Sequence, residues 1–297
     1  MITTYSIQTL CESLKERIFS PGFQQRHCLT KNGFTRNRLL PFPKLISYIL
    51  TLPKKSTVSA LDNFFESLNL SLVPSKQAFS KARQFVDFQA FKELFFLTTD
   101  ILDFTDSPAL WKNYHLFAVD GMNLSLPSTK ETRAEFGILR RYSQERVSPK
   151  VSVLYDITND LIVDVHFGTV KTDANERRHA ITFLSTKVLK RRDTKQCILL
   201  FDRGYPGREL IDHLEDKQLK FLMRCSTSFL NEVNEASMGD HIVIDDYKGR
   251  QTKLRVLKFK LPSGEIEMLV TNVLTQDLTL SDMKELYFMR WGIITIS

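Results

Sequence analysis

Cysteine is scarce in this chain, and its four copies form no recognisable binding pattern. Cys11, Cys28, Cys197 and Cys225 lie far apart, with no Cys-x-x-Cys pair and no histidine at the spacing of a zinc site. Cys197 opens a predicted strand and Cys225 closes another, so both are expected in the core. The pattern argues against a zinc site and indicates reduced thiols in an intracellular protein.

Long apolar runs are also missing. The most apolar segment near the N-terminus, residues 45–52, is far too short to span a bilayer. Before it, Ile7, Leu10, Leu14 and Ile18 recur at helical spacing among polar residues, whereas a signal peptide requires a continuous apolar block. The sequence shows no internal repeat and no low-complexity linker. We therefore expect a cytoplasmic protein that does not enter a membrane.

Acidic residues are nearly absent from one segment, residues 15–55. This segment has nine basic residues and one acidic residue, Glu16, in a chain with a net charge of +7 and a pI of about 9.1. The basic residues are Lys15, Arg17, Arg26, Lys31, Arg36, Arg38, Lys44, Lys54 and Lys55. Such a one-signed stretch suggests a polyanionic partner, most simply nucleic acid; the alternative is a solvated basic surface.

The length of 297 residues predicts two domains. The composition, 42% hydrophobic and 25% charged, is that of an ordinary globular protein, so both domains are expected to be folded. The first, residues 1–106, is predicted to be helical, basic and DNA-binding. Its predicted helices follow residues 41–43 and cover 57–68, 75–86 and 87–103. The second and third of these have the pattern of a helix-turn-helix, with Lys76 and Arg83 on the outward stripe. An ordinary helical hairpin with a charged outer face also explains the pattern.

From residue 107 onward, strands alternate with helices, which predicts an α/β domain with mixed strand directions over 107–297. Strands are predicted over 114–121, 151–157, 161–168, 197–202 and 220–225, and helices over 175–190, over 206–217 and from 279. The strands 151–157 and 161–168 are expected to pair as a hairpin, because Thr158, Asn159 and Asp160 favour a turn.

A β-rich insertion is predicted over about residues 228–276. Its apolar residues have even numbers at Leu254 and Val256 but odd numbers at Leu257 and Phe259. Because successive side chains of a strand point to opposite faces, this change of alternation predicts a β-bulge or a bend. The insertion is also predicted to carry a basic face, made of Lys253, Arg255, Lys258 and Lys260.

Two of the predicted strands end on an aspartate that is followed at once, or nearly so, by glycine. Asp120 and Asp202 each share a strand face with the apolar residues two and four positions before them. If the strands are neighbours, the two carboxylates meet at the carboxyl edge of the sheet, where open α/β sheets bind ligands. Paired carboxylates at such an edge can hold a divalent ion. The alternative is a pair of aspartates that cap turns.

Several short motifs occur in a definite order along the chain. They are PFPK (41–44), AFSKAR (78–83), VDG (119–121), VSVLYD (151–156), Lys171 with Glu176 and Arg177, and LFDRGY (200–205). In this order and spacing they resemble the DDE transposases of bacterial insertion sequences, specifically the insertion-sequence-four family with its Y-R-E-K signature. The resemblance covers roughly residues 31–292.

The resemblance implies a ribonuclease-H-like catalytic core with a β-rich insertion between the second Asp and the final Glu. It implies that Asp120 and Asp202 are catalytic and bind Mg²⁺ or Mn²⁺, with two ions in the intact family enzyme. The implied activity is cleavage of double-stranded DNA at transposon ends and strand transfer into target DNA. It also allows a homodimer in the DNA complex, and a bacterial cytoplasmic protein that associates with the nucleoid when it binds DNA.

Part of the Y-R-E-K signature is missing. Tyr287 and Arg290 match it, but Ile294 stands where the glutamate belongs, and the sequence ends before the lysine position. Glu285, nine residues earlier, would lie on the opposite side of a helix. We therefore expect a transposase truncated at its C-terminus, weakly active or inactive. Alternatives are a non-catalytic DNA-binding remnant, an inhibitor of intact transposase, or an unrelated metal-dependent nuclease.

Four residues near the expected active site are predicted to contact DNA: Lys171, Arg203, Tyr287 and Arg290. Tyr287 and Arg290 lie one helical turn apart and would hold a phosphate near the cleaved bond. Alternatively, Arg203 takes part in simple turn chemistry, and Tyr287 and Arg290 are a packed tyrosine and a surface arginine. The helix after Lys171 is expected to be capped by Asp173 or Asn175.

Overall fold

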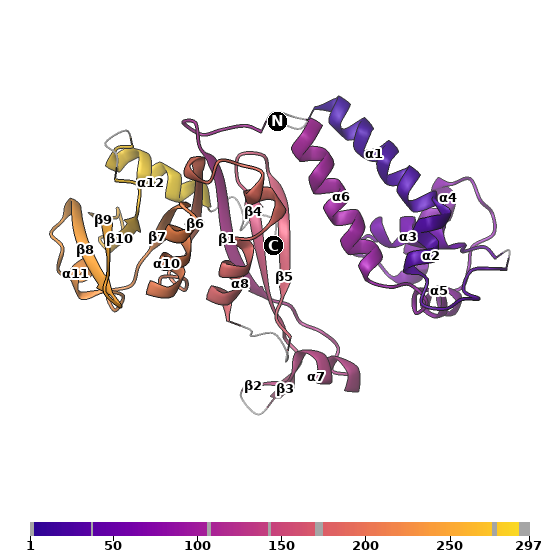
Figure 1. Cartoon of the computed structure of the whole chain (residues 1–297). Coiled ribbons are helices and arrows are strands. Elements are labelled where there is room, and N and C mark those ends of the chain that lie inside the picture. Colours follow the sequence, from indigo (N-terminus) through magenta and orange to yellow (C-terminus); the bar gives the residue numbers. More distant parts are fainter. Residues whose placement is uncertain are drawn as a thin grey trace. The chain divides into compact units, whose positions relative to one another are not determined.

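The computed structural model describes residues 3–36, 38–105, 108–141, 144–169, 175–274 and 278–290. The chain divides into two compact units, residues 2–107 and 108–297. Figure 1 labels most of the helices and strands of both units. Among the described residues, no helix combines the length and the apolar character that are needed to cross a bilayer.

The first unit is helical. Its described helices are α1 (Thr4–Phe19), α2 (Pro21–His27), α3 (Phe42–Leu50), α4 (Thr57–Ser67), α5 (Lys76–Arg83) and α6 (Gln89–Thr105). The hydroxyls of Ser56 and Ser75 begin α4 and α5, because they accept hydrogen bonds from the backbone N–H of Ser59 and Ala78. The sequence pattern does not predict α2.

Two apolar clusters hold these helices together. In one, Tyr48 of α3 meets Phe64 and Phe79 edge-on, at ring-centroid distances of 5.2 and 5.0 Å. The other cluster joins α1, α2, α3 and α6. Phe88 is 72% exposed, because α6 begins only after it, at Gln89, whose backbone N–H donates to the carboxylate of Asp87.

Glu93 of α6 ties α1 and α2 to α6. Its carboxylate accepts hydrogen bonds from Arg17 at 2.5 Å and from Arg26 at 2.8 Å, and it contacts His27 Nε2 at 2.7 Å. Burial acts to raise the pKa of Glu93, but the bonds from His27, Arg17 and Arg26 outweigh burial and lower the pKa to about 2. The carboxylate therefore stabilises the unit above the ordinary glutamate pKa of 4.5, and this effect is lost as the pH falls toward 2.

The second unit is organised around an eight-stranded sheet, in the order β5-β4-β1-β6-β7-β10-β9-β8. Its strands are β1 (His115–Asn123), β4 (Lys150–Asp156), β5 (Leu161–Phe167), β6 (Cys197–Phe201), β7 (Lys220–Arg224), β8 (Gly239–Tyr247), β9 (Arg250–Lys260) and β10 (Ile266–Thr271). The pairs β1–β6 and β6–β7 are parallel, and the other pairs are antiparallel. The predicted mixed α/β sheet and the predicted β4–β5 hairpin are thus confirmed.

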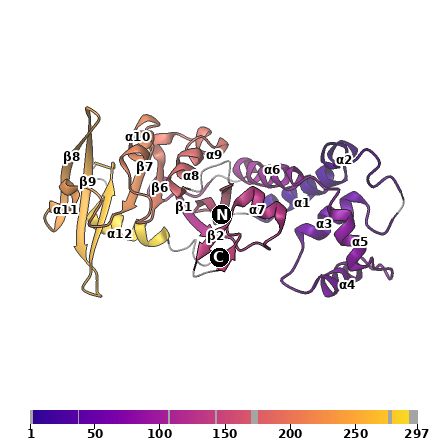
Figure 2. The same cartoon turned by 90° about the horizontal axis from the view of Figure 1, so that it is seen from below.

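Helices cover the sheet on both faces. The longer ones are α8 (Glu176–Phe183), α10 (Arg208–Asp216) and α12 (Leu280–Met289), and two short helices are α9 (Lys187–Lys190) and α11 (Asn231–Glu235). Phe117 and Val119 of β1 pack with residues of α8 and α10, whereas Leu116 and Ala118 pack with residues of α12. In Figure 2, α9 and α10 lie on one side of β6 and β7, and α12 lies on the other side.

The connection between β1 and β4 contains structure that the sequence pattern does not predict. It forms α7 (Lys130–Phe136) and a separate hairpin of β2 (Leu139–Arg141) and β3 (Gln144–Arg146). Thr129 begins α7 through a capping box with Thr132. Figure 1 shows these elements beyond the ends of β1 and β4.

Three sequence predictions for this unit are wrong, wholly or in part. The helix expected over 175–190 is two helices, because Thr186 caps a separate start at α9. Of the two alternatives predicted for β9, a bulge or a bend, the bulge is missing along the described strand, which pairs with β8 and β10 in continuous register. Its apolar residues change parity because both faces are buried, Val256 in one apolar cluster and Leu257 in the other. The expected basic face is interrupted, because Arg255 is buried and paired with Asp240 at 2.6 Å.

We predict that Glu93→Gln loosens the helical unit at neutral pH, because it removes the charge that three basic side chains share. Hydrogen exchange measured by mass spectrometry should be about five to ten times faster in α1 and α6, as expected for a partly exposed network worth about 1 kcal/mol. The difference from wild type should shrink as the pH approaches 2. The matched control is Glu66→Gln on the exposed side of α4, which should behave like wild type; equal effects of both variants would contradict the assignment.

Candidate active site

Neighbouring parallel strands bring Asp120 and Asp202 to one edge of the sheet. Val119 of β1 pairs with Phe201, the last residue of β6, and the two aspartates come next in the chain. Asp202 directly follows β6, whereas Asp120 lies within β1, which continues to Asn123 instead of ending at the aspartate as predicted. Asp120 is two residues after Ala118, and Asp202 is two residues after Leu200; both apolar residues belong to the cluster under α12. By strand alternation, the two carboxylates point to the face that α12 covers. The side chains are 26% and 42% exposed. The predicted adjacency of the two strands is therefore found.

The C-terminal end of helix α12 places Arg290 next to both carboxylates. Arg290 Nη1 lies 3.7 Å from Asp120 Oδ1, and Nη2 lies 3.8 Å from Asp202 Oδ1. The arginine is only 2% exposed, which excludes the alternative of a surface arginine. One turn earlier, the Tyr287 hydroxyl donates a hydrogen bond of 3.5 Å to Asp202 Oδ1. Thus both residues that match the signature reach the aspartates.

The local sequence explains why α12 lies in this position. Thr279 and Asp282 form a capping box that fixes the first turn of the helix. Met283, Leu286 and Tyr287 are buried in the apolar cluster on this face of the sheet. Because these side chains recur at helical spacing, they hold one side of α12 against the strands and direct its last turn to their carboxyl ends.

Burial and neighbouring charges set the protonation of this site. Burial raises the pKa of Asp120, the Arg290 guanidinium and the Gly121 N–H act against burial, and the charges of Asp202 and Glu176 raise the pKa further. Burial therefore makes ionisation of Asp120 more costly than it is in water, and the Arg290 guanidinium offsets part of that cost. Burial also raises the pKa of Tyr287 to about 12, so its hydroxyl keeps the proton that it donates to Asp202.

The chemistry of this edge fits a divalent ion such as Mg²⁺. Asp120 and Asp202 offer hard carboxylate oxygens, the ligands that Mg²⁺ prefers, and the Arg290 guanidinium already provides positive charge between them. In the part of the chain that the structure describes, no three His, Cys, Asp or Glu side chains form a group that could hold a metal ion. An ion bound by the two aspartates would complete its shell with oxygens of water or substrate, as Mg²⁺ commonly does.

The turn after β6 contains Arg203, which is predicted from the sequence to contact DNA. Its side chain is exposed, and its backbone N–H donates a hydrogen bond of 2.6 Å to Asp202 Oδ1. Gly204 follows, and its carbonyl accepts a hydrogen bond of 3.3 Å from Arg177 Nε of α8. The turn therefore orients the Asp202 carboxylate while the Arg203 side chain faces solvent.

The remaining predicted site residues lie elsewhere. Lys171 and Asp173 fall outside the described residues, as does Ile294, and α8 is capped by Asn175, whose side chain accepts from the Arg177 N–H at 2.9 Å. Lys76 and Arg83 belong to α5 of the helical unit, and both side chains are exposed.

Sequence reasoning missed the role of Glu176 in this site. Its carboxylate adds to the negative charge around Asp120 and forms an ion pair of 2.6 Å with Lys150 Nζ. Glu176 occurs in one of the family motifs, but spacing alone does not place it beside the aspartates, because it reaches them from a helix on the opposite face of the sheet.

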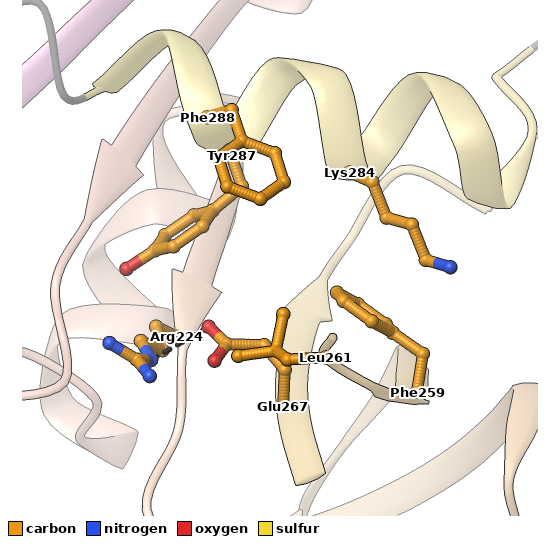
Figure 3. A pocket seen from close by; sticks show the side chains of 7 residues that line it. All are labelled: Arg224, Phe259, Leu261, Glu267, Lys284, Tyr287 and Phe288. Carbon is orange, nitrogen blue, oxygen red and sulfur yellow. Dashed lines mark ion pairs between the residues drawn. The ribbon is translucent and has the colours of Figure 1, made fainter. Parts of the chain in front are cut away.

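A small pocket of about 80 Å³ lies against α12, next to the site (Figure 3). It is lined by Arg224, Phe259, Leu261, Glu267, Lys284, Tyr287 and Phe288. Arg224 and Glu267 form a largely buried ion pair of 2.7 Å, and the Lys284 ammonium lies 4.3 Å from the centre of the Phe259 ring. Neither aspartate lines this pocket, so it is separate from the carboxylate pair.

Comparisons with known proteins identify the family and support the fold. A family model described as a transposase DDE domain matches residues 111–293. The cryo-EM structure of a piggyBac transposase synaptic complex with hairpin DNA is similar, with a TM-score of 0.57 and 12% sequence identity. The likeness covers 96% of this chain and 66% of that one, and at this identity it shows the fold alone, which is ribonuclease-H-like. A search of the curated proteins gave no match.

We predict that Arg290→Met destabilises the protein by about 2 kcal/mol without divalent ions, because two adjacent carboxylates lose their shared cation. Thermal unfolding should show this loss, and millimolar Mn²⁺ should reverse much of it. Arg255→Met, which breaks the buried pair with Asp240, is the control and should be destabilised without rescue by Mn²⁺. Equal rescue of both variants would contradict a role for Arg290 at an ion-binding edge.

Proposed function

Because the chain belongs to the transposase DDE domain family, we propose that it binds double-stranded DNA at transposon ends and acts in metal-dependent strand cleavage and transfer. The observation that carries the proposal is the convergence of Asp120 and Asp202, from parallel neighbouring strands, on one buried guanidinium. The motif order and the match of Tyr287 and Arg290 support the bacterial insertion-sequence-four type. In that setting the protein is cytoplasmic and associates with the nucleoid through DNA.

The residues of the site have separate roles in this proposal. Asp120 and Asp202 hold Mg²⁺ or Mn²⁺, which when bound activates a water or hydroxyl group and stabilises the leaving oxygen. Tyr287 orients Asp202 through its hydrogen bond, and Arg290 balances the charge of both carboxylates. The exposed guanidinium of Arg203 lies on the solvent side of this edge, where it can contact a DNA phosphate.

The helical unit is proposed to bind DNA. Its exposed helix α5 carries Lys76, Lys81 and Arg83, and nine basic residues occur over 15–55. Arg83 also lies over the ring of Phe79, 5.8 Å from its centre, which keeps the guanidinium close to the helix surface. These features support contacts with phosphates, and a homodimer on two DNA ends is compatible with them.

A non-catalytic DNA-binding protein that inhibits intact transposase is the second candidate. The observation that favours it is Ile294, an apolar residue at the signature position of the third acid. Both candidates bind DNA, so strand cleavage separates them.

We predict that the double variant Lys76→Gln/Arg83→Gln binds linear double-stranded DNA about tenfold more weakly than wild type, because two phosphate contacts are lost. The slope of log affinity against log salt should become smaller by about 2, which fluorescence anisotropy over a salt series would measure. Lys92→Gln, an exposed change on α6, is the control. Unchanged affinity and slope in the double variant would place the DNA contacts elsewhere.

We also predict that the chain nicks transposon-end DNA poorly with Mn²⁺, and that Ile294→Glu raises the rate about 100-fold, because a third carboxylate completes the charge around the ion. The control is Ile294→Gln, because a glutamine side chain has the shape of glutamate without its charge. Adding Asp120→Asn to Ile294→Glu should abolish the gain. If Ile294→Glu binds DNA but gains no cleavage, the catalytic proposal fails and the inhibitor remains.

A further inference from the structure

Glu176 lies against the backbone that follows each aspartate. A Cβ atom placed on Gly121, the residue after Asp120, would lie 2.6 Å from Glu176 Oε1. A Cβ atom placed on Gly204, two residues after Asp202, would lie 3.4 Å from Glu176 Oε2. The carboxylate therefore extends from the backbone of β1 next to Asp120 to the turn that follows Asp202, on the face of the sheet that α8 covers. Glycine at position 121 leaves the space that the carboxylate occupies.

The first turn of α8 is fixed in this position. Arg177 donates to the carbonyl of Gly204 at 3.3 Å, and His179 Nδ1 contacts Ser152 Oγ of β4 at 2.8 Å in a buried bond. Lys150, also of β4, pairs with Glu176 Oε1 at 2.6 Å. Glu176 is thus held near the strand ends by contacts to both neighbouring segments, and its placement does not depend on Lys150 alone.

A buried hydroxyl is close enough to the same carboxylates to feel their charge. Tyr205 is 2% exposed, and its hydroxyl forms no hydrogen bond with the described residues, although Ser152 lies nearby. Burial raises its pKa, and the charges of Glu176, Asp120 and Asp202 raise it further. The charges of three carboxylates thus act on one buried hydroxyl near this edge, and a cation bound close to them would offset those charges.

We propose that Glu176 strengthens divalent-ion binding by Asp120 and Asp202, as a third negative charge supplied from α8. This inference rests on the proposed function, because it takes the two aspartates as the residues that hold the ion. In the ion-free protein, Lys150 balances the charge of Glu176 and competes with the ion for it.

A simpler explanation of Glu176 is purely structural. An acidic residue in the first turn of a helix is favourable next to the helix dipole, and a partly exposed Lys–Glu pair adds little more. Under that explanation, removing the charge of Glu176 changes helix stability slightly and leaves ion binding unchanged. The two explanations therefore differ in a property that can be measured without any DNA cleavage.

The test measures Mn²⁺ binding to the full chain without DNA. The electron paramagnetic resonance signal reports the concentration of Mn²⁺ that stays unbound. Glu176→Gln should bind Mn²⁺ about tenfold more weakly than wild type. Lys150→Gln should bind it about threefold more tightly, because a competing positive charge is removed. Misfolding would weaken binding in both variants, so opposite changes identify the charge effect.

Two further variants make the result decisive. Glu209→Gln, an exposed acid in the first turn of α10, is the matched control and should bind Mn²⁺ like wild type. Asp120→Asn should lose the site. If Asp120→Asn weakens binding and Glu176→Gln equals wild type, or weakens it no more than Glu209→Gln, this inference is overturned and the proposed function stands. If Asp120→Asn binds like wild type, both are overturned.

Discussion

The contact of one buried arginine with two aspartates is the interaction on which the site depends. Parallel pairing of β1 and β6 places Asp120 and Asp202 side by side, and a second negative charge at this distance raises the cost of ionising the first. A guanidinium is always charged, so Arg290 can offset that cost at any physiological pH. The repulsion between the two carboxylates is thus offset by a residue from a different element, at the C-terminal end of α12.

The period of two along a strand determines which element can supply that charge. Leu116, Ala118 and Asp120 share one face of β1, and the apolar pair on that face packs under α12. The same residues that bury α12 therefore point the aspartate toward its last turn. A shift of β1 by one residue would turn Asp120 toward the face of α8 and α10 and separate it from Arg290.

Sequence periodicity predicted the parts of the site that depend on local structure. Asp120 and Asp202 follow apolar runs, so strand alternation alone indicates that both carboxylates lie at one sheet edge, whereas the assignment of Tyr287 and Arg290 rests on the resemblance to the Y-R-E-K signature. Glu176 could not be assigned in either way, because its distance from the aspartates depends on how α8 packs on the opposite face of the sheet. The continuous register of β9 was missed for a related reason: both of its faces are buried, so its apolar pattern no longer alternates.

The position of Arg290 also couples the binding of the two proposed ligands, the divalent ion and DNA. In the ion-free protein its guanidinium is engaged by carboxylates on both strands, which leaves less of its charge for a phosphate. Once a divalent ion neutralises those carboxylates, the attraction between Arg290 and an incoming phosphate increases, while the repulsion of that phosphate by Asp120 and Asp202 falls. Because such coupling is reciprocal, bound DNA would raise the affinity of the site for the ion by the same factor. The arginine assigned to DNA by its sequence position and the arginine that neutralises the aspartates in the structure can therefore be one residue with both roles.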